Sequence, residues 1–243
     1  MPALDRPYWI EARLERREGW DETVYPFNVP AVRTTDTIAF HPRVTFLVGE
    51  NGSGKSTLIE ALAVAWGFNA EGGSRDHHYA TRASHSPLHR FVRPVRSSQK
   101  AQDGYFLRAE SYFTTATYLE STGTVRAGQT DVHEKSHGES FFDLFQNRFE
   151  GQGLYIMDEP EAALSPSRQL SFLARLHTLV QDGSQFIIAT HSPIILGYPD
   201  AWIYQTSAHG LDRVQYEDTE HYEVTKGFLN RRETYLDVLL ADD

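Results

Sequence analysis

The apolar positions of the chain fall into short runs that predict buried strands separated by helices. Residues 44–48, 154–157 and 185–189 are nearly continuous apolar or β-branched runs, which is typical of strands covered on both faces. Between residues 170 and 180, apolar residues recur at helical spacing instead. Strand, helix and strand in this order predict parallel crossover connections and a layered α/β fold.

The run at residues 44–48 continues into a glycine-rich loop and then a helical pattern between Leu58 and Trp66. Two further strands are expected at residues 8–17 and 104–109. Residues 75–102 show no clean period and contain Ser, His, Pro and Arg throughout, so they predict a loop-rich insertion with some helix.

The glycine-rich loop, Gly49-Glu-Asn-Gly-Ser-Gly-Lys-Ser, matches G-x-x-x-x-G-K-[ST] at every position. Glycines let backbone N–H groups turn toward phosphate oxygens, and the helix that follows adds its positive end. We expect Lys55 to reach the β- and γ-phosphates, Ser56 to coordinate Mg²⁺ and Thr57 to contact the α-phosphate. A chance match in a structural turn is the alternative, and the strand before and helix after the loop argue against it. The expected phosphate-binding set also includes Gly49, Asn51, Gly52, Ser53 and Gly54.

Two acidic residues, Asp158 and Glu159, follow the apolar run 154–157. A strand that ends in two carboxylates can offer one to Mg²⁺ and the other to an attacking water. Asp158 suits the metal, and Glu159 suits the general base, a role that contributes about 10²–10⁴-fold in rate. A solvated acidic turn is the alternative for these residues taken alone, and the phosphate loop makes it the weaker one.

His191 follows the run 185–189 within the sequence Ala-Thr-His-Ser-Pro, so it is expected at a strand end beside the phosphate site. Contact with the γ-phosphate or the attacking water is predicted, and packing or a plain loop role is the alternative. Residues 163–169 open a helix with Ser165 as its N-cap. Residues 135–140, Lys-Ser-His-Gly-Glu-Ser, precede an aromatic-rich helix.

Composition restricts the class of protein. The chain has 243 residues, 40% of them hydrophobic, which is ordinary for one α/β domain. Its apolar runs are far shorter than the roughly 20 residues that cross a bilayer, and residues 1–17 lack the apolar core of a signal peptide. The absence of cysteine excludes disulfides and thiolate metal sites. We therefore expect a cytoplasmic protein with no membrane insertion.

The charge of the chain is uneven. The net charge of −10 argues against a wholly basic nucleic-acid binder. Basic residues nevertheless gather in one segment, which either is a solvated surface or touches nucleic acid or another polyanion. They are Arg75, Arg82, Arg90, Arg93, Arg96 and Lys100.

The order of these motifs resembles that of the ABC-type ATPases over nearly the whole chain. The phosphate loop, signature, Asp-Glu strand, D-loop and switch histidine of that family correspond here to GENGSGKST, SHGES, LYIMDEPE, ALSPSR and ATHSP. Ser136 and Gly138 match the usual Leu-Ser-Gly-Gly-Gln signature, whereas Lys135, His137 and Glu139 depart from it. Such departures are more similar to the non-transporter branch of SMC, recombination and repair ATPases, and to small stand-alone bacterial ATPases, than to transporter subunits. An ordinary Ser-Gly helix start is the alternative for this signature.

The resemblance implies a site shared between two copies. In that family the signature of one subunit contacts the γ-phosphate held by its partner, so Ser136 and Gly138 would complete the site of a second chain. ATP would then join a head-to-tail homodimer.

The resemblance also implies two parts that the sequence defines poorly. Glu110 would stand in for the Q-loop glutamine as a further metal ligand, with Arg108 or a surface role as alternatives. Tyr25 or Phe27 would stack on adenine, with core packing as the alternative for both.

The predicted fold is therefore an α/β P-loop ABC-ATPase head. It has a layered, mostly parallel sheet, an N-terminal antiparallel β part and a small helical signature lobe. Residues 1–70 and 151–243 would form the nucleotide-binding core, and about 71–150 the inserted lobe. The interval from Lys55 to Ser136 suits a compact lobe and is far too short for the coiled-coil arms of SMC-type proteins.

The predicted function is slow, Mg²⁺-dependent ATP hydrolysis by an ATP-switched homodimer. It would act on a nucleic acid or a protein effector, as in repair or defence. The energy subunit of a membrane ABC transporter is one alternative, and an ATP-binding module with negligible turnover is another. A shared fold does not by itself imply a shared task.

Overall fold

The computed structural model describes residues 7–74, 86–108, 137–207 and 209–241, and of residues 137–141 it describes only the backbone. Its strands are β1 (Trp9–Leu14), β2 (Thr37–Ala39), β3 (Val44–Val48), β4 (Gly73–Ser74), β5 (Val92–Arg96), β6 (Asp103–Arg108), β7 (Gly153–Asp158), β8 (Gln185–Ala189), β9 (Trp202–Ser207) and β10 (Gly210–Val214). Its α-helices are α1 (Pro30–Arg33), α2 (Lys55–Trp66), α4 (His137–Asn147), α5 (Pro166–Gln181), α6 (Pro193–Leu196), α7 (Glu220–Asn230) and α8 (Arg232–Leu239). Short 3-10 helices are η1 (Pro87–Phe91), η2 (Pro160–Ala163) and η3 (Tyr216–Asp218).

A seven-stranded sheet with the order β10-β9-β3-β8-β7-β6-β4 forms the centre of the described chain. Strands β9, β3, β8, β7 and β6 are parallel, and β10 and β4 add antiparallel edges. The mostly parallel, layered α/β fold predicted from the apolar runs is confirmed. Because β3, β8 and β7 are parallel neighbours, the loops after all three meet at one edge of the sheet.

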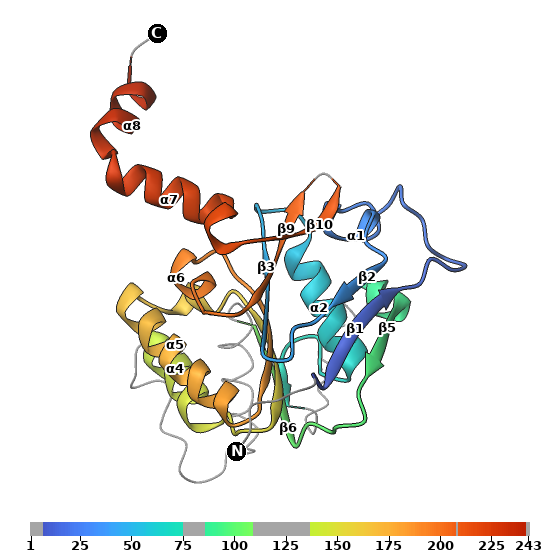
Figure 1. Ribbon diagram of the computed structural model, residues 1–243. Coiled ribbons are helices and arrows are strands. Elements are labelled where there is room, and N and C mark those ends of the chain that lie inside the picture. The colour runs from blue at the N-terminus through green and yellow to red at the C-terminus, as the bar shows by residue number, and fades with distance from the viewer. Residues whose placement is uncertain (1–6, 75–85, 109–136, 208, 242–243) are drawn as a thin grey trace.

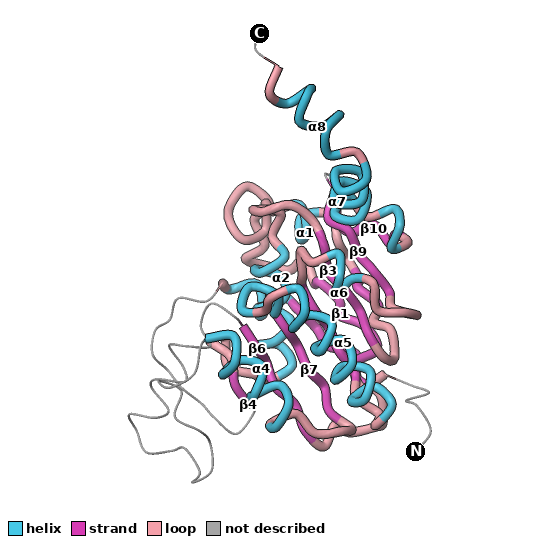
Figure 2. Tube along the Cα trace, turned by 90° about the vertical axis from the view of Figure 1, so that its left-hand side faces the viewer, coloured by secondary structure: helices cyan, strands magenta, loops and turns pink. Residues whose placement is uncertain are grey.

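The two faces of this sheet are covered by different layers (Figures 1 and 2). One face packs against α2 and a three-stranded sheet, with Leu47, Ile156 and Ile187 pointing into that core. The other face packs against α4, α5 and α6, with Phe46 and Tyr155 among its core residues. Side chains of successive strand residues point to opposite faces, so burial on both sides explains why these strands are continuous apolar runs.

The three-stranded sheet is antiparallel, with the order β2-β1-β5. It confirms the predicted N-terminal antiparallel part, because β1 lies within the expected strand at residues 8–17. The expectation of a loop-rich segment is wrong at residues 92–96, where β5 pairs with β1. Pro94 and the two arginines Arg93 and Arg96 obscure the strand pattern, and proline is tolerated there because β5 is an edge strand.

The segment predicted as an inserted lobe also contributes β6, which pairs with β7 in the central sheet. The division into domains at residues 70 and 150 stays a prediction. Helix α7 runs outward from the rest of the molecule in Figure 1, α8 extends beyond it in Figures 1 and 2, and neither helix has a buried residue. In the described part of the chain, every helix is too short or too polar to cross a bilayer.

Candidate functional site

The glycine-rich loop joins β3 to α2 at the edge where the parallel strands end. Gly54 caps α2 with a φ of 97°, a conformation that residues with a Cβ rarely adopt. A Cβ on Gly54 would lie 2.5 Å from Cγ2 of Val29, and a Cβ on Gly49 would lie 1.6 Å from Oγ1 of Thr206. Both glycines are therefore required by the shape of the loop.

The Lys55 side chain is folded over this loop. Its Nζ donates hydrogen bonds to the carbonyl oxygens of Gly49, at 2.7 Å, and Glu50, at 2.8 Å. Burial lowers the pKa of the Lys55 ammonium, while the carboxylates of Glu159 and Asp158 act in the opposite direction. The loop thus holds a buried cation where it would meet phosphate oxygens.

Asp158 ends β7 directly beside the start of α2. The Ser56 hydroxyl donates to Oδ1 of Asp158 over 3.3 Å, and the Asp158 side chain is buried. A hydroxyl and a carboxylate are the oxygen ligands that Mg²⁺ accepts, with waters and phosphate oxygens completing its shell. The pair therefore fits the magnesium site predicted from the sequence. Among the described residues, no group of three or more His, Cys, Asp or Glu side chains is placed to hold a metal ion.

Glu159 follows Asp158 in a left-handed backbone conformation, with φ 51° and ψ 54°. Such a conformation costs a non-glycine residue of the order of 1–3 kcal/mol and is concentrated at functional sites. The Glu159 side chain remains 35% exposed, and its Oε1 lies 3.4 Å from Nε2 of His191. The predicted base and the predicted switch histidine therefore face each other across the ends of β7 and β8.

Glu161 holds the loop that carries His191, a role that the sequence patterns did not indicate. Its Oε2 accepts a hydrogen bond from the Thr190 hydroxyl at 2.8 Å, and its Oε1 accepts one from the His191 backbone N–H at 2.5 Å. Burial raises the pKa of the Glu161 carboxyl, and these hydrogen bonds act against the rise. The acidic segment after β7 is thus tied directly to the histidine loop after β8.

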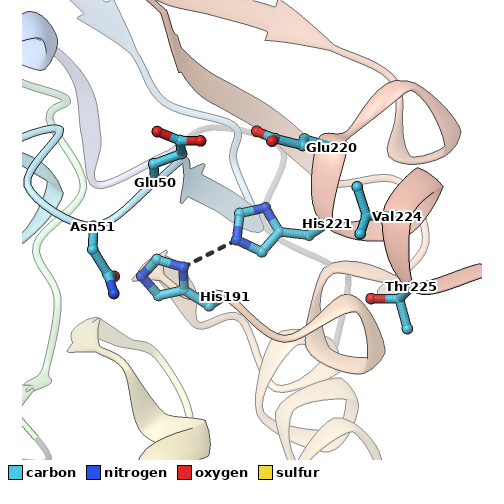
Figure 3. A pocket seen from close by; sticks show the side chains of 7 residues that line it. All are labelled: Glu50, Asn51, His191, Glu220, His221, Val224 and Thr225. Carbon is cyan, nitrogen blue, oxygen red and sulfur yellow. Dashed lines mark hydrogen bonds between the residues drawn. The ribbon is translucent and has the colours of Figure 1, made fainter. Parts of the chain in front are cut away.

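A second histidine, His221 in the first turn of α7, lies beside His191 (Figure 3). Nδ1 of His191 and Nε2 of His221 are 3.0 Å apart. The two rings line a cleft of about 510 Å³ between the phosphate loop and α7. Its lining consists of Glu50, Asn51, His191, Glu220, His221, Val224 and Thr225.

The family model for the AAA domain matches residues 28–152, more than half of the chain. The chain belongs to the AAA-domain family. No curated protein sequence matches it.

Among solved structures, it is similar to CbiO1 from Clostridium perfringens, part of the ABC transporter complex CbiONQ. That similarity has 15% sequence identity and a TM-score of 0.51, and it covers 94% of this chain and 98% of CbiO1. An SMC head domain from Thermotoga maritima matches with 16% identity and a TM-score of 0.39, covering 73% of this chain and 92% of the other. The predicted P-loop ABC-type ATPase fold is confirmed.

Two predicted site residues of this AAA-domain protein, Glu110 and Ser136, lie outside the described residues. Gly138 lies in the first turn of α4. At the place where a Q-loop residue was expected, the last residue of β6 is Arg108. Its Nη1 lies 2.8 Å from Oε2 of Glu60, and its Nε lies 3.6 Å from Oδ2 of Asp158. Arg108, one of the two alternatives to Glu110, thus lies near Oδ2 of the predicted metal ligand Asp158, whereas Ser56 contacts its Oδ1.

The two candidate adenine contacts are in different environments. Phe27 is buried and packs against Trp20 and Phe91, with ring centroids 4.7 and 5.0 Å away. Tyr25 is 61% exposed, and its hydroxyl is 3.1 Å from Oγ1 of Thr57. Phe27 is therefore a core residue, and Tyr25 lies beside the residue expected to contact the α-phosphate.

The described part of the basic segment belongs largely to β5 and its neighbours. The Arg96 guanidinium lies over the Trp66 ring, 4.2 Å from its centroid, and donates to the Trp66 carbonyl. Arg93 pairs with Glu15 at 3.3 Å and remains exposed. Of these two arginines, only Arg93 offers its charge mainly to solvent.

Proposed function

We propose that the chain binds Mg²⁺-ATP at the edge where β3, β7 and β8 end, and hydrolyses it. One observation carries the proposal. The Ser56–Asp158 pair and the Glu159–His191 pair, from segments far apart in the sequence, come together around the buried Lys55 ammonium. This is the set of cation, metal ligands, base and γ-phosphate contact that phosphoryl transfer to water requires.

Each side chain would act on a separate part of the substrate. Lys55 binds the β- and γ-phosphate oxygens, and Gly49, Asn51, Gly52, Ser53 and Gly54 form the backbone cradle. Ser56 and Asp158 would hold Mg²⁺, which supplies positive charge at the phosphate oxygens when bound. Glu159 accepts the proton of the attacking water, and His191 donates to the γ-phosphate oxygens. Thr57 binds the α-phosphate, and the exposed Tyr25 ring stacks on the adenine.

A second copy of the chain would complete this site. We propose that Ser136 and the first turn of α4 with Gly138 bind the γ-phosphate held by the partner, because the N-terminus of a helix favours anions. ATP then joins two chains head to tail, and hydrolysis releases them. Size analysis of Glu159→Gln is the test. Mg²⁺-ATP should shift this variant to a dimer, and the additional change Gly138→Asp should prevent the shift.

The hydrolysis itself is tested by phosphate release with Mg²⁺-ATP. We expect turnover in the wild type and a loss of about 10²–10⁴-fold in Glu159→Gln, with ATP binding retained. Glu18→Gln is the matched control, because it makes the same chemical change at an exposed position. Unchanged phosphate release in Glu159→Gln would refute the assignment of the base. Tight binding without turnover in the wild type would support the ATP-binding module instead.

We further propose that the dimer acts on a nucleic acid or a protein partner. The departures of Lys135, His137 and Glu139 from the usual signature support this interpretation over a transporter subunit. Binding to nucleic acid should fall steeply with salt and be weakened by Arg93→Glu. Stoichiometric co-purification with a membrane-spanning protein would favour the transporter alternative.

A further inference from the structure

The two imidazoles of His191 and His221 form a hydrogen-bonded pair that joins α7 to the reacting end of the site. Nδ1 of His191 lies 3.0 Å from Nε2 of His221, and the ring planes are inclined by 48° (Figure 3). The rings therefore meet edge to edge rather than face to face. In a pair of neutral rings, a single proton lies between these two nitrogens, and one ring must donate while the other accepts.

The surroundings decide which ring donates. Nε2 of His191 is buried and makes no hydrogen bond within the described part of the chain, and Oε1 of Glu159 lies 3.4 Å from it. An ionised carboxylate attracts an N–H and repels a lone pair, so the tautomer with the proton on Nε2 of His191 is favoured. Nδ1 of His191 then has a lone pair, and Nε2–H of His221 is the donor of the 3.0 Å hydrogen bond.

The second ring nitrogen of His221, Nδ1, supports the same assignment of protons. Nδ1 of His221 is buried and has no hydrogen-bond partner in the described part of the chain. If Nδ1 carried a proton, it would be an orphaned buried donor, which is rarer in proteins than an unpaired acceptor. With the proton on Nε2, the unpaired atom of His221 is an acceptor instead.

Both rings are held neutral by their surroundings. Burial lowers the pKa of His191, and Lys55 and His221 lower it further, whereas Glu159 raises it. Burial also lowers the pKa of His221, where Lys55 acts in the same direction, and Glu220 and Glu50 oppose it. Near neutral pH both rings are therefore uncharged, and a single proton lies between their facing nitrogens.

The backbone just before His221 is fixed to the rest of the molecule by hydrogen bonds. Thr219 is fully buried and caps α7 by accepting from the Tyr222 N–H at 3.4 Å. The Glu220 N–H donates to Oε1 of Gln205 on β9, and the Tyr216 hydroxyl donates to the carbonyl of Pro193, just after the His191 loop. The first turn of α7 is thus fastened to the sheet, although the rest of the helix is exposed.

We propose that His221 is a positioning residue for His191: its Nε2–H holds the His191 ring in the tautomer whose Nε2–H points at the γ-phosphate. The proposal rests on the proposed ATP hydrolysis, in which His191 is the residue that touches substrate. A fixed tautomer matters because the other one would present a lone pair to an anionic oxygen.

The kinetic test compares His221→Gln with His221→Leu. The amide nitrogen of glutamine can donate from nearly the position of Nε2, whereas leucine has a similar volume and no donor. We expect His221→Leu to lower kcat for ATP hydrolysis about 10–100-fold with KM little changed, and His221→Gln to stay within about threefold of the wild type. In a His191→Ala background, His221→Leu should cause no further loss. Equal losses in the Gln and Leu variants, or no loss in either, would overturn the proposal.

A second readout needs no nucleotide and no substitution of His221. Nitrogen-15 spectra of histidine-labelled wild-type protein, with the His191 signals assigned by comparison with His191→Gln, report which ring nitrogen carries the proton. The expected result is a protonated Nε2 and an unprotonated Nδ1 on His191. A protonated Nδ1 on His191 would overturn the proposal. Absence of phosphate release by the wild type would instead refute the proposed function, and the spectra would still decide the tautomer.

Discussion

The substitution Glu161→Gln should test whether Glu161 holds the loop that carries His191 in place, without itself taking part in ATP hydrolysis. Glu161 is not itself expected to contact the nucleotide, yet its two carboxylate oxygens accept hydrogen bonds from the Thr190 hydroxyl and the His191 N–H. Glutamine keeps one acceptor oxygen and places an NH₂ group opposite a donor. The change therefore removes one hydrogen bond to a buried carboxylate and leaves one buried donor without a partner.

The size of the effect follows from these contacts. A hydrogen bond to a charged group contributes about 1.5–3 kcal/mol, so the free energy of unfolding should fall by about 2 kcal/mol. For a chain of this length, each 1 kcal/mol shifts Tm by about 2–4 °C, which gives an expected decrease of about 4–8 °C. Hydrolysis should also fall because the loop that carries His191 loses its anchor, whereas ATP affinity should persist because Lys55 and Ser56 belong to α2.

Thermal unfolding, nucleotide titration and phosphate release measured on the same preparations provide the assay. Glu18→Gln serves as the control for the loss of one carboxylate at an exposed position. If Glu161→Gln unfolds within about one degree of Glu18→Gln and hydrolyses ATP equally fast, Glu161 does not hold the histidine loop.

Three other substitutions test separate parts of the account. Gly54→Ala should abolish measurable ATP binding by calorimetry, because its Cβ would lie 2.5 Å from Cγ2 of Val29 at a φ of 97°; normal affinity would show that the loop tolerates another shape. Lys55→Ala should weaken ATP binding by tenfold or more at pH 7.5, and an unchanged dissociation constant would contradict its role at the phosphates. Burial lowers the pKa of the His221 imidazole below its ordinary value of 6.5, so below that pH the unfolded chain binds more protons than the folded chain. The resulting stabilisation is complete above pH 6.5 and is lost as the pH falls through the folded pKa. Denaturant unfolding between pH 8 and 5 should therefore show a shallower decline for His221→Gln than for the wild type, and parallel curves would contradict this.

The central strands and the main site residues could both be predicted from the sequence, because the site residues follow soon after strands with unmistakable apolar runs. Strands β3, β7 and β8 are buried on both faces, so their apolar runs are unbroken, and Lys55, Asp158, Glu159 and His191 follow soon after these runs. Parallel neighbours bring those ends together without further information. The helices α2 and α5 were predictable from helical spacing, and Ser165 caps α5 as expected.

The remaining parts depend on tertiary contacts that local patterns do not encode. The strand β5 was missed because Pro94 and charged residues hide an edge strand. His221 lies in a polar stretch far along the chain and reaches His191 only through the packing of α7 against the loop after β8. Glu161 belongs to the acidic motif LYIMDEPE, but that motif does not indicate its partners. Glu161 meets Thr190 and His191 only because β7 pairs with β8.

The most direct test of the central claim is the crystal structure of Glu159→Gln with Mg²⁺-ATP. We expect a triphosphate between Lys55 of one copy and the first turn of α4, with Gly138, of a second copy. The γ-phosphate should lie within hydrogen-bond distance of Nε2 of His191. A bound triphosphate whose γ-phosphate faces solvent, with residues 136–140 of every neighbouring copy far from it, would contradict the shared site.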